Sequence, residues 1–328
     1  MTNRTARALG LCSGGLDSIL AALLLKRQNI YVEWVSFETP FFSSEKAEKA
    51  ALIHTIPLTV VNITEAYLRM LQNPACGYGK YMNPCLDCHA LMFREAGKLM
   101  EEKKFDFLFS GEVLGQRPMS QTRPSLRYVE KKSGYDGYIL RPLSAKRMPE
   151  TIFEKKGMVK RELLMDITGR SRKPQIKTAA EMNAGDYPAP AGGCLLTDKG
   201  YSARLKDLFA HKSEYAEKEL HLLRYGRHIR LHETSKIIVG RNEKDNENIV
   251  KHYRPDCDIL IATQDIPGPT VLLDSGGRED IRAAAAICAG YSKAEKGRGV
   301  IVEVRTPEGR YNLEVLGVPP IENRGMMI

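Results

Sequence analysis

Two groups of residues in this 328-residue chain have the types and spacing to do chemistry. The first is a run of six residues: Ser13, Gly14, Gly15, Leu16, Asp17 and Ser18. Paired glycines let a backbone approach a phosphate closely, and the free N–H groups that open a helix attract anions. The serine hydroxyls add donors, and Asp17 would hold Mg²⁺ or orient a nucleotide. This run, which we call the nucleotide turn, therefore predicts a phosphate site. A tight turn capped by Asp17 is the alternative.

The second group is three cysteines, which we call the thiol group: Cys85, Cys88 and Cys194. Cys85 and Cys88 open a predicted helix, whose N-terminus would lower their thiol pKa values, and Cys194 follows two glycines. Three such thiolates can hold a cubane cluster with one open iron, or can carry a persulfide that ends as a disulfide. A structural pair, a zinc site and haem attachment at Cys-x-x-Cys-His are the alternatives. The sequence has no second Cys-x-x-Cys to complete a zinc site.

The other cysteines and the histidine of this motif receive simpler interpretations. Cys12, Cys257 and Cys288 lie in apolar contexts and are expected in the core. Cys76 lies in a glycine-containing loop and stays unassigned. No two histidines have a metal-binding spacing, so His89 is expected on a helix surface.

Alternating apolar and helical patterns position these residues. Strands are predicted at 8–12, 31–37, 58–61 and 105–110, and helices at 18–27, 45–53 and 86–103. This order predicts an α/β fold with a doubly wound, mainly parallel sheet covered on both faces. Ligands of such sheets bind beyond the carboxyl ends of the strands. The nucleotide turn, Phe37 and Gly111 all fall there.

A second, smaller α+β domain is predicted after residue 209, so that the domains span 1–209 and 210–328. Its strands are predicted at 228–231, 237–240, 259–262, 271–274 and 300–304, and its helices at 243–252 and 279–289. A glycine- and proline-rich loop covers 185–198 and carries Cys194. Residues 211–223 are expected to form a single linker helix.

The net charge of +9 is concentrated in the first domain, because residues 210–328 contain 18 basic and 18 acidic residues. Residues 117–177 alone hold 16 basic and 6 acidic residues, which favours a polyanion such as nucleic acid over an ordinary solvated face. The second domain has a local cationic strip with two tyrosines that could stack on bases: Arg224, Arg227, His228, Arg230, His232, Tyr225 and Tyr253. A dimerisation or purely structural role is the alternative for this domain.

Composition and the first residues point to a cytoplasmic protein. No apolar run has membrane-spanning length, and the N-terminal residues carry no secretory signal. The seven cysteines are therefore expected to be reduced thiols rather than a disulfide framework.

The strings along residues 8–200 resemble the PP-loop ATP pyrophosphatases, and most of all the ThiI-type tRNA 4-thiouridine synthetases. The resemblance lies in the nucleotide turn, in Ser-Gly-Glu-Val-Leu-Gly-Gln at 110–116, in Ser-Gln-Thr at 120–122 and in Arg-Pro-Leu at 141–143. Asn-Pro-Cys-x-x-Cys at 83–88 also resembles the MnmA-type tRNA 2-thiouridylases. The later lone cysteine is similar to that of thiolases with a [4Fe-4S] cluster, such as TtuA and archaeal ThiI.

The second domain resembles the NFACT-R domain, through residues 236–242, 247–248 and 265–269. ThiI-type enzymes usually carry a THUMP domain before the PP-loop and some carry a rhodanese domain after it. Here the loop starts at residue 13, and an NFACT-R-like domain follows. This departure leaves the recognised tRNA position open.

The resemblance implies an enzyme that thiolates tRNA. ATP would lie on the nucleotide turn, Phe37 and Gly111, with Mg²⁺ at Asp17, and would adenylate a uridine carbonyl oxygen. Sulfur would then displace AMP and give 4-thiouridine. Asp17 and the thiol group would be catalytic, with the thiol group holding a [4Fe-4S] cluster or carrying a persulfide.

The expected partners are tRNA and a sulfur donor, either sulfide or a cysteine desulfurase persulfide, with no membrane; a homodimer stays open. Three alternatives remain. The enzyme could be a 2-thiouridylase, or a PP-loop sulfurtransferase or synthetase acting on a small molecule. The chain could also be a non-enzymatic RNA-binding adaptor.

Overall fold

The computed structural model describes residues 4–189, 194–295 and 297–328. The chain divides into two compact units, residues 1–197 and 198–328. Residues 190–193 of the predicted loop at 185–198 lie outside the described residues, whereas Cys194 is described.

The first unit is built on a parallel sheet of five strands, in the order β3-β2-β1-β4-β5. The strands are β1 (Arg7–Leu11), β2 (Tyr31–Glu38), β3 (Leu58–Asn62), β4 (Phe107–Ser110) and β5 (Ile139–Leu140). The prediction of a doubly wound parallel sheet is therefore confirmed. The sequence pattern missed β5 because two residues give no periodicity.

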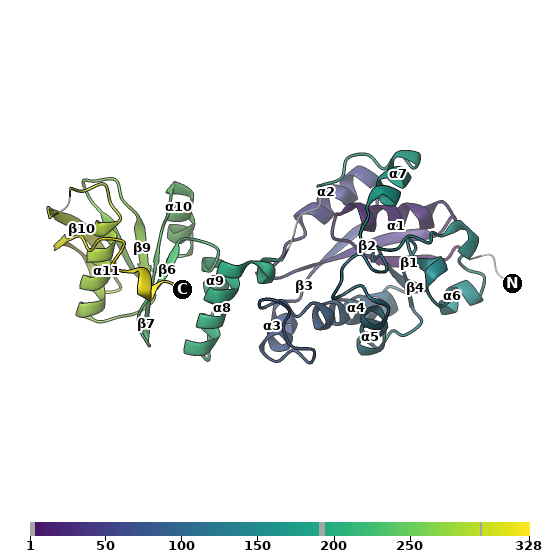
Figure 1. Cartoon of the computed structure of the whole chain (residues 1–328), viewed down its shortest axis with the longest axis horizontal. Helices are drawn as coiled ribbons and strands as arrows, with labels where there is room; N and C mark the ends of the chain where they lie inside the picture. The colour runs from purple at the N-terminus through teal and green to yellow at the C-terminus, as the bar shows by residue number, and fades with distance from the viewer. Residues whose placement is uncertain (1–3, 190–193, 296) are drawn as a thin grey trace. The chain divides into compact units, whose positions relative to one another are not determined.

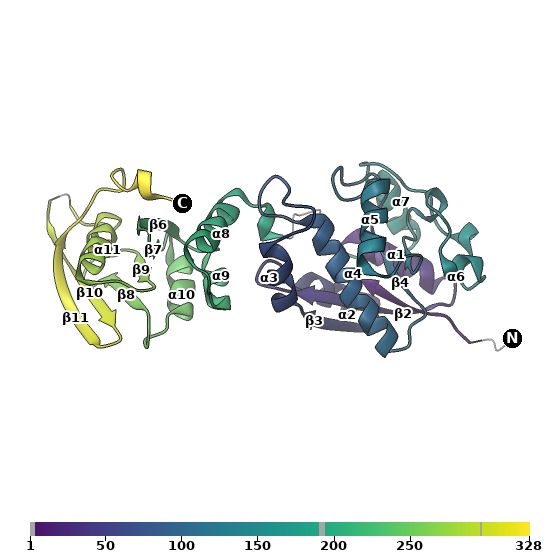
Figure 2. The ribbon, with the colours of Figure 1, turned by 90° about the horizontal axis from the view of Figure 1, so that it is seen from below.

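Helices cover both faces of this sheet (Figures 1 and 2). On one face lie α1 (Leu16–Lys26), α2 (Glu45–His54) and α7 (Lys173–Glu181), and on the other lie α3 (Thr64–Gln72), α4 (Cys85–Glu102) and α5 (Arg123–Ser133). A short α6 (Ile152–Lys155) follows β5. The helices α3, α5, α6 and α7 were not predicted, because they are short, amphipathic or rich in charge.

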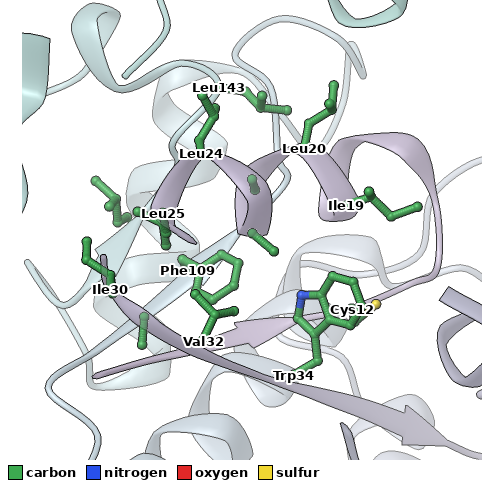
Figure 3. Packing of buried hydrophobic residues seen from close by; sticks show 14 of the residues in the cluster. Cys12, Ile19, Leu20, Leu24, Leu25, Ile30, Val32, Trp34, Phe109 and Leu143 are labelled. Atoms are coloured by element: carbon green, nitrogen blue, oxygen red, sulfur yellow. The ribbon is translucent and has the colours of Figure 1, made fainter. Parts of the chain in front are cut away.

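Helix α1 is the centre of the first core. In Figure 3, Leu25 of α1 lies on the side of the strands, towards Ile30 and Phe109, whereas Leu20 and Leu24 point to the opposite side, where Leu143 lies. Eight of the eleven residues of α1 are buried, because α7 packs against the side of α1 that the sheet leaves uncovered. The buried helix holds the nucleotide turn, at its N-terminus, in a fixed position.

The second unit contains an antiparallel sheet of six strands, in the order β11-β10-β8-β9-β7-β6. The strands are β6 (Arg227–His232), β7 (Ser235–Val239), β8 (Ile259–Thr263), β9 (Thr270–Leu273), β10 (Gly299–Thr306) and β11 (Gly309–Leu316). Alternate residues of β7 face two cores: Ile237 and Val239 pack with α11 (Arg278–Gly290), and Ile238 with α10 (Glu243–His252). The predicted α+β character is confirmed.

The predicted single helix over 211–223 is wrong. Helix α8 (Lys199–His211) ends where that helix should begin, and α9 (Glu217–Leu222) starts anew. Lys212 is extended, with φ −133° and ψ 120°. The Glu219 side chain then accepts a hydrogen bond from the Ala216 N–H, which fixes a new N-terminus for α9. Within the described residues, no helix combines the length and apolar character needed to cross a membrane.

Candidate functional site

The nucleotide turn joins β1 to α1, and no side chain caps the N-terminus of this helix. Gly14 has φ +69°, and a Cβ there would lie 2.2 Å from the backbone carbonyl of Lys46. Gly15 caps α1 without any side-chain hydrogen bond, and Ser13 is exposed. The Ser18 hydroxyl is buried and donates to the Gly15 carbonyl, at 2.7 Å. The uncapped first turn of α1 can therefore bind an anion through its backbone N–H groups.

The loop after β4 closes against this turn. The strand order reverses between β1 and β4, which is where doubly wound sheets bind their ligands. A Cβ at Gly111 would lie 2.3 Å from the carbonyl carbon of Asp17, so only glycine permits this approach. Phe37 lies near the carboxyl end of the neighbouring β2 and is buried. The structure thus places all the nucleotide-binding residues that the sequence suggested at one edge of the sheet.

Asp17 is half-buried at this edge, among amide and guanidinium groups. Its Oδ2 accepts a hydrogen bond from Gln116 Nε2 at 3.0 Å, and its Oδ1 is buried without a partner among the described residues. Burial raises the pKa of the Asp17 carboxyl group, although Gln116, Arg172 and Arg117 act in the opposite direction. A carboxylate oxygen with no protein partner fits a Mg²⁺ ion, which takes one or two carboxylates together with phosphate oxygens.

Further buried polar atoms around Asp17 also lack partners among the described residues. They are Oε1 of Gln116, Nε of Arg172, and both side-chain amide atoms of Gln175. Gln175 lies close enough to lower the pKa of the Asp17 carboxyl group, but its amide atoms are outside hydrogen-bond geometry. Buried polar atoms are normally bonded. Such a group beside an anion-binding turn is suited to a polar ligand. The sequence analysis missed Arg172 and Gln175, which only the fold brings to the turn.

The thiol group also assembles in this unit. Burial raises the pKa of the Cys88 thiol well above its ordinary value, and the nearby Cys194 and Cys85 raise it further. The hydroxyl of the buried Tyr67 hydrogen-bonds to Cys88 and only partly opposes these effects. The expected lowering of the Cys88 pKa by the helix N-terminus is therefore wrong, because loss of solvent outweighs the helix dipole.

Cys194 reaches the same place from a different segment. The next residue, Leu195, donates its N–H to the Phe41 carbonyl at 3.1 Å, beyond the end of β2. Burial raises the pKa of the Cys194 thiol to about 11, with a further contribution from Cys85, while Arg117 lowers it. Arg117 also acts on the Asp17 carboxyl group. Asp17 of the nucleotide turn and Cys194 of the thiol group therefore both lie within electrostatic range of the Arg117 guanidinium.

The three thiols do not form a metal centre as they stand. Across residues 4–189, 194–295 and 297–328, no group of three or more His, Cys, Asp or Glu side chains is arranged to hold a metal ion. The three cysteines are near enough to influence one another's ionisation.

The other cysteines divide into buried and exposed pairs. Cys12 and Cys288 are buried, as predicted, and burial raises their thiol pKa values to about 11 and about 12. Cys12 also supports the nucleotide turn, because its Sγ accepts a hydrogen bond from the Gly14 N–H at 3.3 Å. The core placement of Cys257 is wrong. It is exposed, like Cys76, because it lies in the turn before β8 beside Asp258 rather than within a strand.

A buried charge network connects the two halves of the site. Glu112, directly after Gly111, accepts a hydrogen bond from Arg141 Nε at 2.9 Å and contacts His89 Nδ1 at 2.7 Å. Burial would raise the pKa of the Glu112 carboxyl group, but Arg141 and His89 outweigh it and lower the pKa to about 2. His89 therefore does not lie free on the helix surface, as was expected. It ties the N-terminal end of α4 to the loop after β4.

The basic residues differ in how far acidic side chains neutralise their charge. Within residues 117–177, Arg141 is buried and pairs with Glu112 and Glu130, but many lysines are exposed: Lys131, Lys132, Lys146, Lys155, Lys160 and Lys173.

The cationic strip expected in the second unit is largely absent. His228 is buried with a lowered pKa, because burial disfavours its charge, and Arg230 pairs with Asp207. His232 pairs with Asp280, and Tyr225 stacks on His252.

Comparison with known proteins agrees with the division of the chain into two units. Residues 4–153 match the family model described as Thiamine biosynthesis protein (ThiI), and residues 226–324 match the NFACT protein RNA binding domain. Residues 4–153 are therefore similar to the ThiI family. Both resemblances stated from the sequence are confirmed at the level of these domains.

Relatives of the ThiI-type domain carry two kinds of name. A "Probable tRNA sulfurtransferase" of Oceanobacillus iheyensis is 28% identical over 157 residues, covering 45% of this chain and 37% of the relative. One from Ureaplasma parvum is 32% identical over 153 residues, covering 44% and 38%. A "tRNA-specific 2-thiouridylase MnmA 2" of Thermoanaerobacter sp. is 27% identical over 229 residues, covering 61% and 57%. The chain thus spans well under two thirds of each of these relatives.

Solved structures give weaker matches. A 4-thiouridine synthetase–RNA complex with bound ATP has a TM-score of 0.35 at 22% identity, with 54% of this chain and 51% of that chain covered. The C-terminal part of the fibronectin/fibrinogen-binding protein of Streptococcus suis has a TM-score of 0.29 at 13% identity, with 74% and 94% covered.

Proposed function

We propose that this protein is an ATP-dependent tRNA sulfurtransferase that converts a uridine carbonyl into a thiocarbonyl, with 4-thiouridine as the product. The observation that carries the proposal is the position of Arg117, within electrostatic range of both Asp17 and Cys194. An anion-binding turn alone supports ATP cleavage, and buried thiols alone support sulfur storage. The turn and the thiols together, in a ThiI-type domain, support an enzyme that first activates a carbonyl group of its substrate and then replaces the carbonyl oxygen with sulfur.

In the activation step, the α-phosphate of ATP lies at the uncapped N-terminus of α1. The uridine carbonyl oxygen attacks it, the bond to the β-phosphate breaks, and pyrophosphate leaves. The backbone N–H groups of the turn and the guanidiniums of Arg117 and Arg172 stabilise the charge that develops on the phosphates. Mg²⁺ held by Asp17 would neutralise phosphate charge when bound.

In the sulfur step, a persulfide on one cysteine of the thiol group attacks the activated carbon of the base, and AMP leaves with the former carbonyl oxygen. A second cysteine then attacks the protein-bound sulfur. That attack releases the thiouridine and leaves a disulfide, which an external thiol must reduce. The buried Tyr67 hydrogen-bonds to Cys88, while the three cysteines themselves are partly exposed. The persulfide sulfur comes from a donor such as a cysteine desulfurase.

A [4Fe-4S] cluster on Cys85, Cys88 and Cys194 is the other form of this proposal, with sulfide on its open iron as nucleophile. The described residues present no site for a single metal ion, and we assign no step to the cluster. Anaerobic purification with iron and sulfide assays separates the two forms. Stoichiometric iron in active protein supports the cluster, and full activity without iron supports the persulfide.

The direct test is thiolation of bulk tRNA with ATP, Mg²⁺ and a sulfur donor, followed by mass spectrometry of the nucleosides. Asp17→Asn should abolish both pyrophosphate release and thiolation. Cys194→Ser should abolish thiolation but leave ATP binding intact, and Cys257→Ser is its control because that exposed thiol lies in the other unit. A Cys194→Ser variant that thiolates at the wild-type rate would refute the sulfur step. Loss of 2-thiouridine rather than 4-thiouridine from a deletion strain would favour the MnmA-like alternative.

A further inference from the structure

A cavity of about 440 Å³ lies on the helical face of the first unit, beside the thiol group but separate from the nucleotide turn. Helices α3 and α4 form its walls, and Lys132 from α5 closes its rim. Asp87 lies between Cys85 and Cys88 in the sequence and lines the cavity. The cavity therefore opens within one helical turn of the cysteines.

The floor of this cavity is apolar and its rim is cationic. Ala66, Met70, Ala90 and Leu91 supply the apolar surface. Four cations line the rest: Arg69, Arg94, Lys98 and Lys132. A flat apolar group can be buried in such a site while a phosphate stays at the rim, which is how proteins bind the unstacked nucleotides of an RNA strand.

Two of these cations are not neutralised within the chain. Arg69 pairs with Glu65, and Lys98 lies 2.7 Å from Glu95. Arg94 donates only to the carbonyl oxygen of Lys132, at 3.1 Å, and across the described residues neither Arg94 nor Lys132 has an ion-pair partner. Lys132 continues into the exposed lysines of the basic stretch at 117–177.

Two acidic residues, Asp87 and Glu95, also line the cavity, but their oxygens already have partners. Glu95 accepts hydrogen bonds from Lys98. Asp87 is 5% exposed. Its Oδ2 accepts a hydrogen bond from the Cys76 N–H at 2.7 Å, and its Oδ1 accepts one from the Tyr128 hydroxyl at 3.1 Å. Its role is to hold the loop before α4 and helix α5 in position around the cavity.

We infer that this cavity binds a nucleotide of the tRNA next to the one that is thiolated, with its base on the apolar floor and its phosphate at Arg94 and Lys132. The inference rests on the proposed tRNA thiolation. An acidic protein, such as a sulfur donor, is the other macromolecule that the cations could attract. An apolar floor beside unpaired cations favours the base and phosphate of an RNA strand over a protein surface.

The test compares three forms of the full chain: wild type, the double variant Arg94→Glu/Lys132→Glu, and Lys49→Glu. Lys49 is an exposed lysine on α2, on the other face of the same unit. Filter binding of bulk tRNA is measured at several salt concentrations, with ATP binding as a check on folding. The double variant should bind tRNA roughly tenfold more weakly, with a salt slope reduced by about two. Lys49→Glu and the ATP affinity of all three forms should stay unchanged.

Three results would overturn the inference. If the double variant binds tRNA like wild type, the cavity is not an RNA site, and the proposed function stands. If it binds tRNA normally and thiolates with inorganic sulfide but not with a protein donor, the cavity docks the donor instead. If wild-type protein neither binds nor thiolates tRNA, the proposed function fails and takes this inference with it. Lys132→Glu alone, at an exposed position, repeats the comparison without disturbing Arg94.

Discussion

The nucleotide turn and the thiol group lie in one domain but are constructed differently. Backbone geometry shapes the turn, through the positive φ of Gly14 and the close approach of Gly111 to Asp17. Side-chain burial shapes the thiol group, which comes from α4 and from the segment at Cys194. A site built from backbone tolerates almost no added atoms, whereas a site built from buried side chains is set by solvent exclusion and neighbouring charge. Each predicted effect below tests one side of this contrast.

The largest expected effect is at Glu112, which links the two halves. Glu112→Gln would remove the buried carboxylate that pairs with Arg141 and His89 and would leave Arg141 with Glu130 alone. It should lower the free energy of unfolding of the first unit by about 3–5 kcal/mol. The pKa of the Glu112 carboxyl group lies near 2, below its ordinary value of 4.5, so its stabilising contribution should be lost as pH falls from 4.5 toward 2.

Urea denaturation from pH 7 down to pH 3 measures this contribution. Glu162→Gln is the matched control, because Glu162 is exposed. Equal stability of both variants at pH 7 would contradict a structural link through Glu112.

The next largest effect tests the nucleotide turn, whose shape depends on backbone geometry. Gly111→Ala would place a Cβ 2.3 Å from the Asp17 carbonyl carbon, so the loop after β4 must move away from the turn. Displacing packed backbone costs about 3 kcal/mol or more, which corresponds to a loss of over a hundredfold in ATP affinity. Isothermal titration with ATP measures the loss. Gly277→Ala is its control, because nothing lies within 4 Å of a Cβ there. Wild-type affinity in Gly111→Ala would show that the loop does not form the site.

The same contrast explains what the sequence could predict. The parallel sheet, the nucleotide turn and Gly111 were predictable, because alternating periodicity and paired glycines reflect the backbone directly. Arg172, Gln175 and the Glu112 network were not, because residues far apart in sequence meet only through the fold. The ionisation of Cys88 was predicted wrongly, because a helix N-terminus is visible in a sequence and the burial that outweighs it is not. The prediction of a cationic strip was wrong for a similar reason, because Asp207, which neutralises Arg230, lies outside the strip in the sequence.

A smaller effect tests the thiol group. The pKa of the Cys194 thiol is near 11 and that of Cys88 is raised further, so both are almost entirely protonated at pH 8. Iodoacetamide should modify them slower, by roughly tens of fold, than an unperturbed thiol. The exposed Cys76 and Cys257 serve as references within the same chain. Time-resolved peptide mass mapping gives the four rates. Modification of Cys88 as fast as Cys257 would mean that the thiol group is open to solvent.

The smallest effect concerns the cost of keeping Asp17 charged. Burial raises the pKa of its carboxyl group above the ordinary 3.8, so the folded chain holds this proton more tightly than the unfolded chain. Above pH 3.8 the ionised Asp17 therefore opposes folding, and the penalty disappears as pH falls through the raised pKa.

Asp17→Asn removes the charge and should raise the melting temperature at pH 7 by roughly 2–4 °C while it abolishes Mg²⁺-dependent ATP binding. Differential scanning calorimetry of both proteins at pH 7 and pH 4 measures this, and the difference between them should shrink at pH 4. A lower melting temperature for Asp17→Asn at pH 7 would mean that Gln116, Arg117 and Arg172 fully compensate the buried charge. The turn would then be a stable element of the fold rather than a site held ready for a cation.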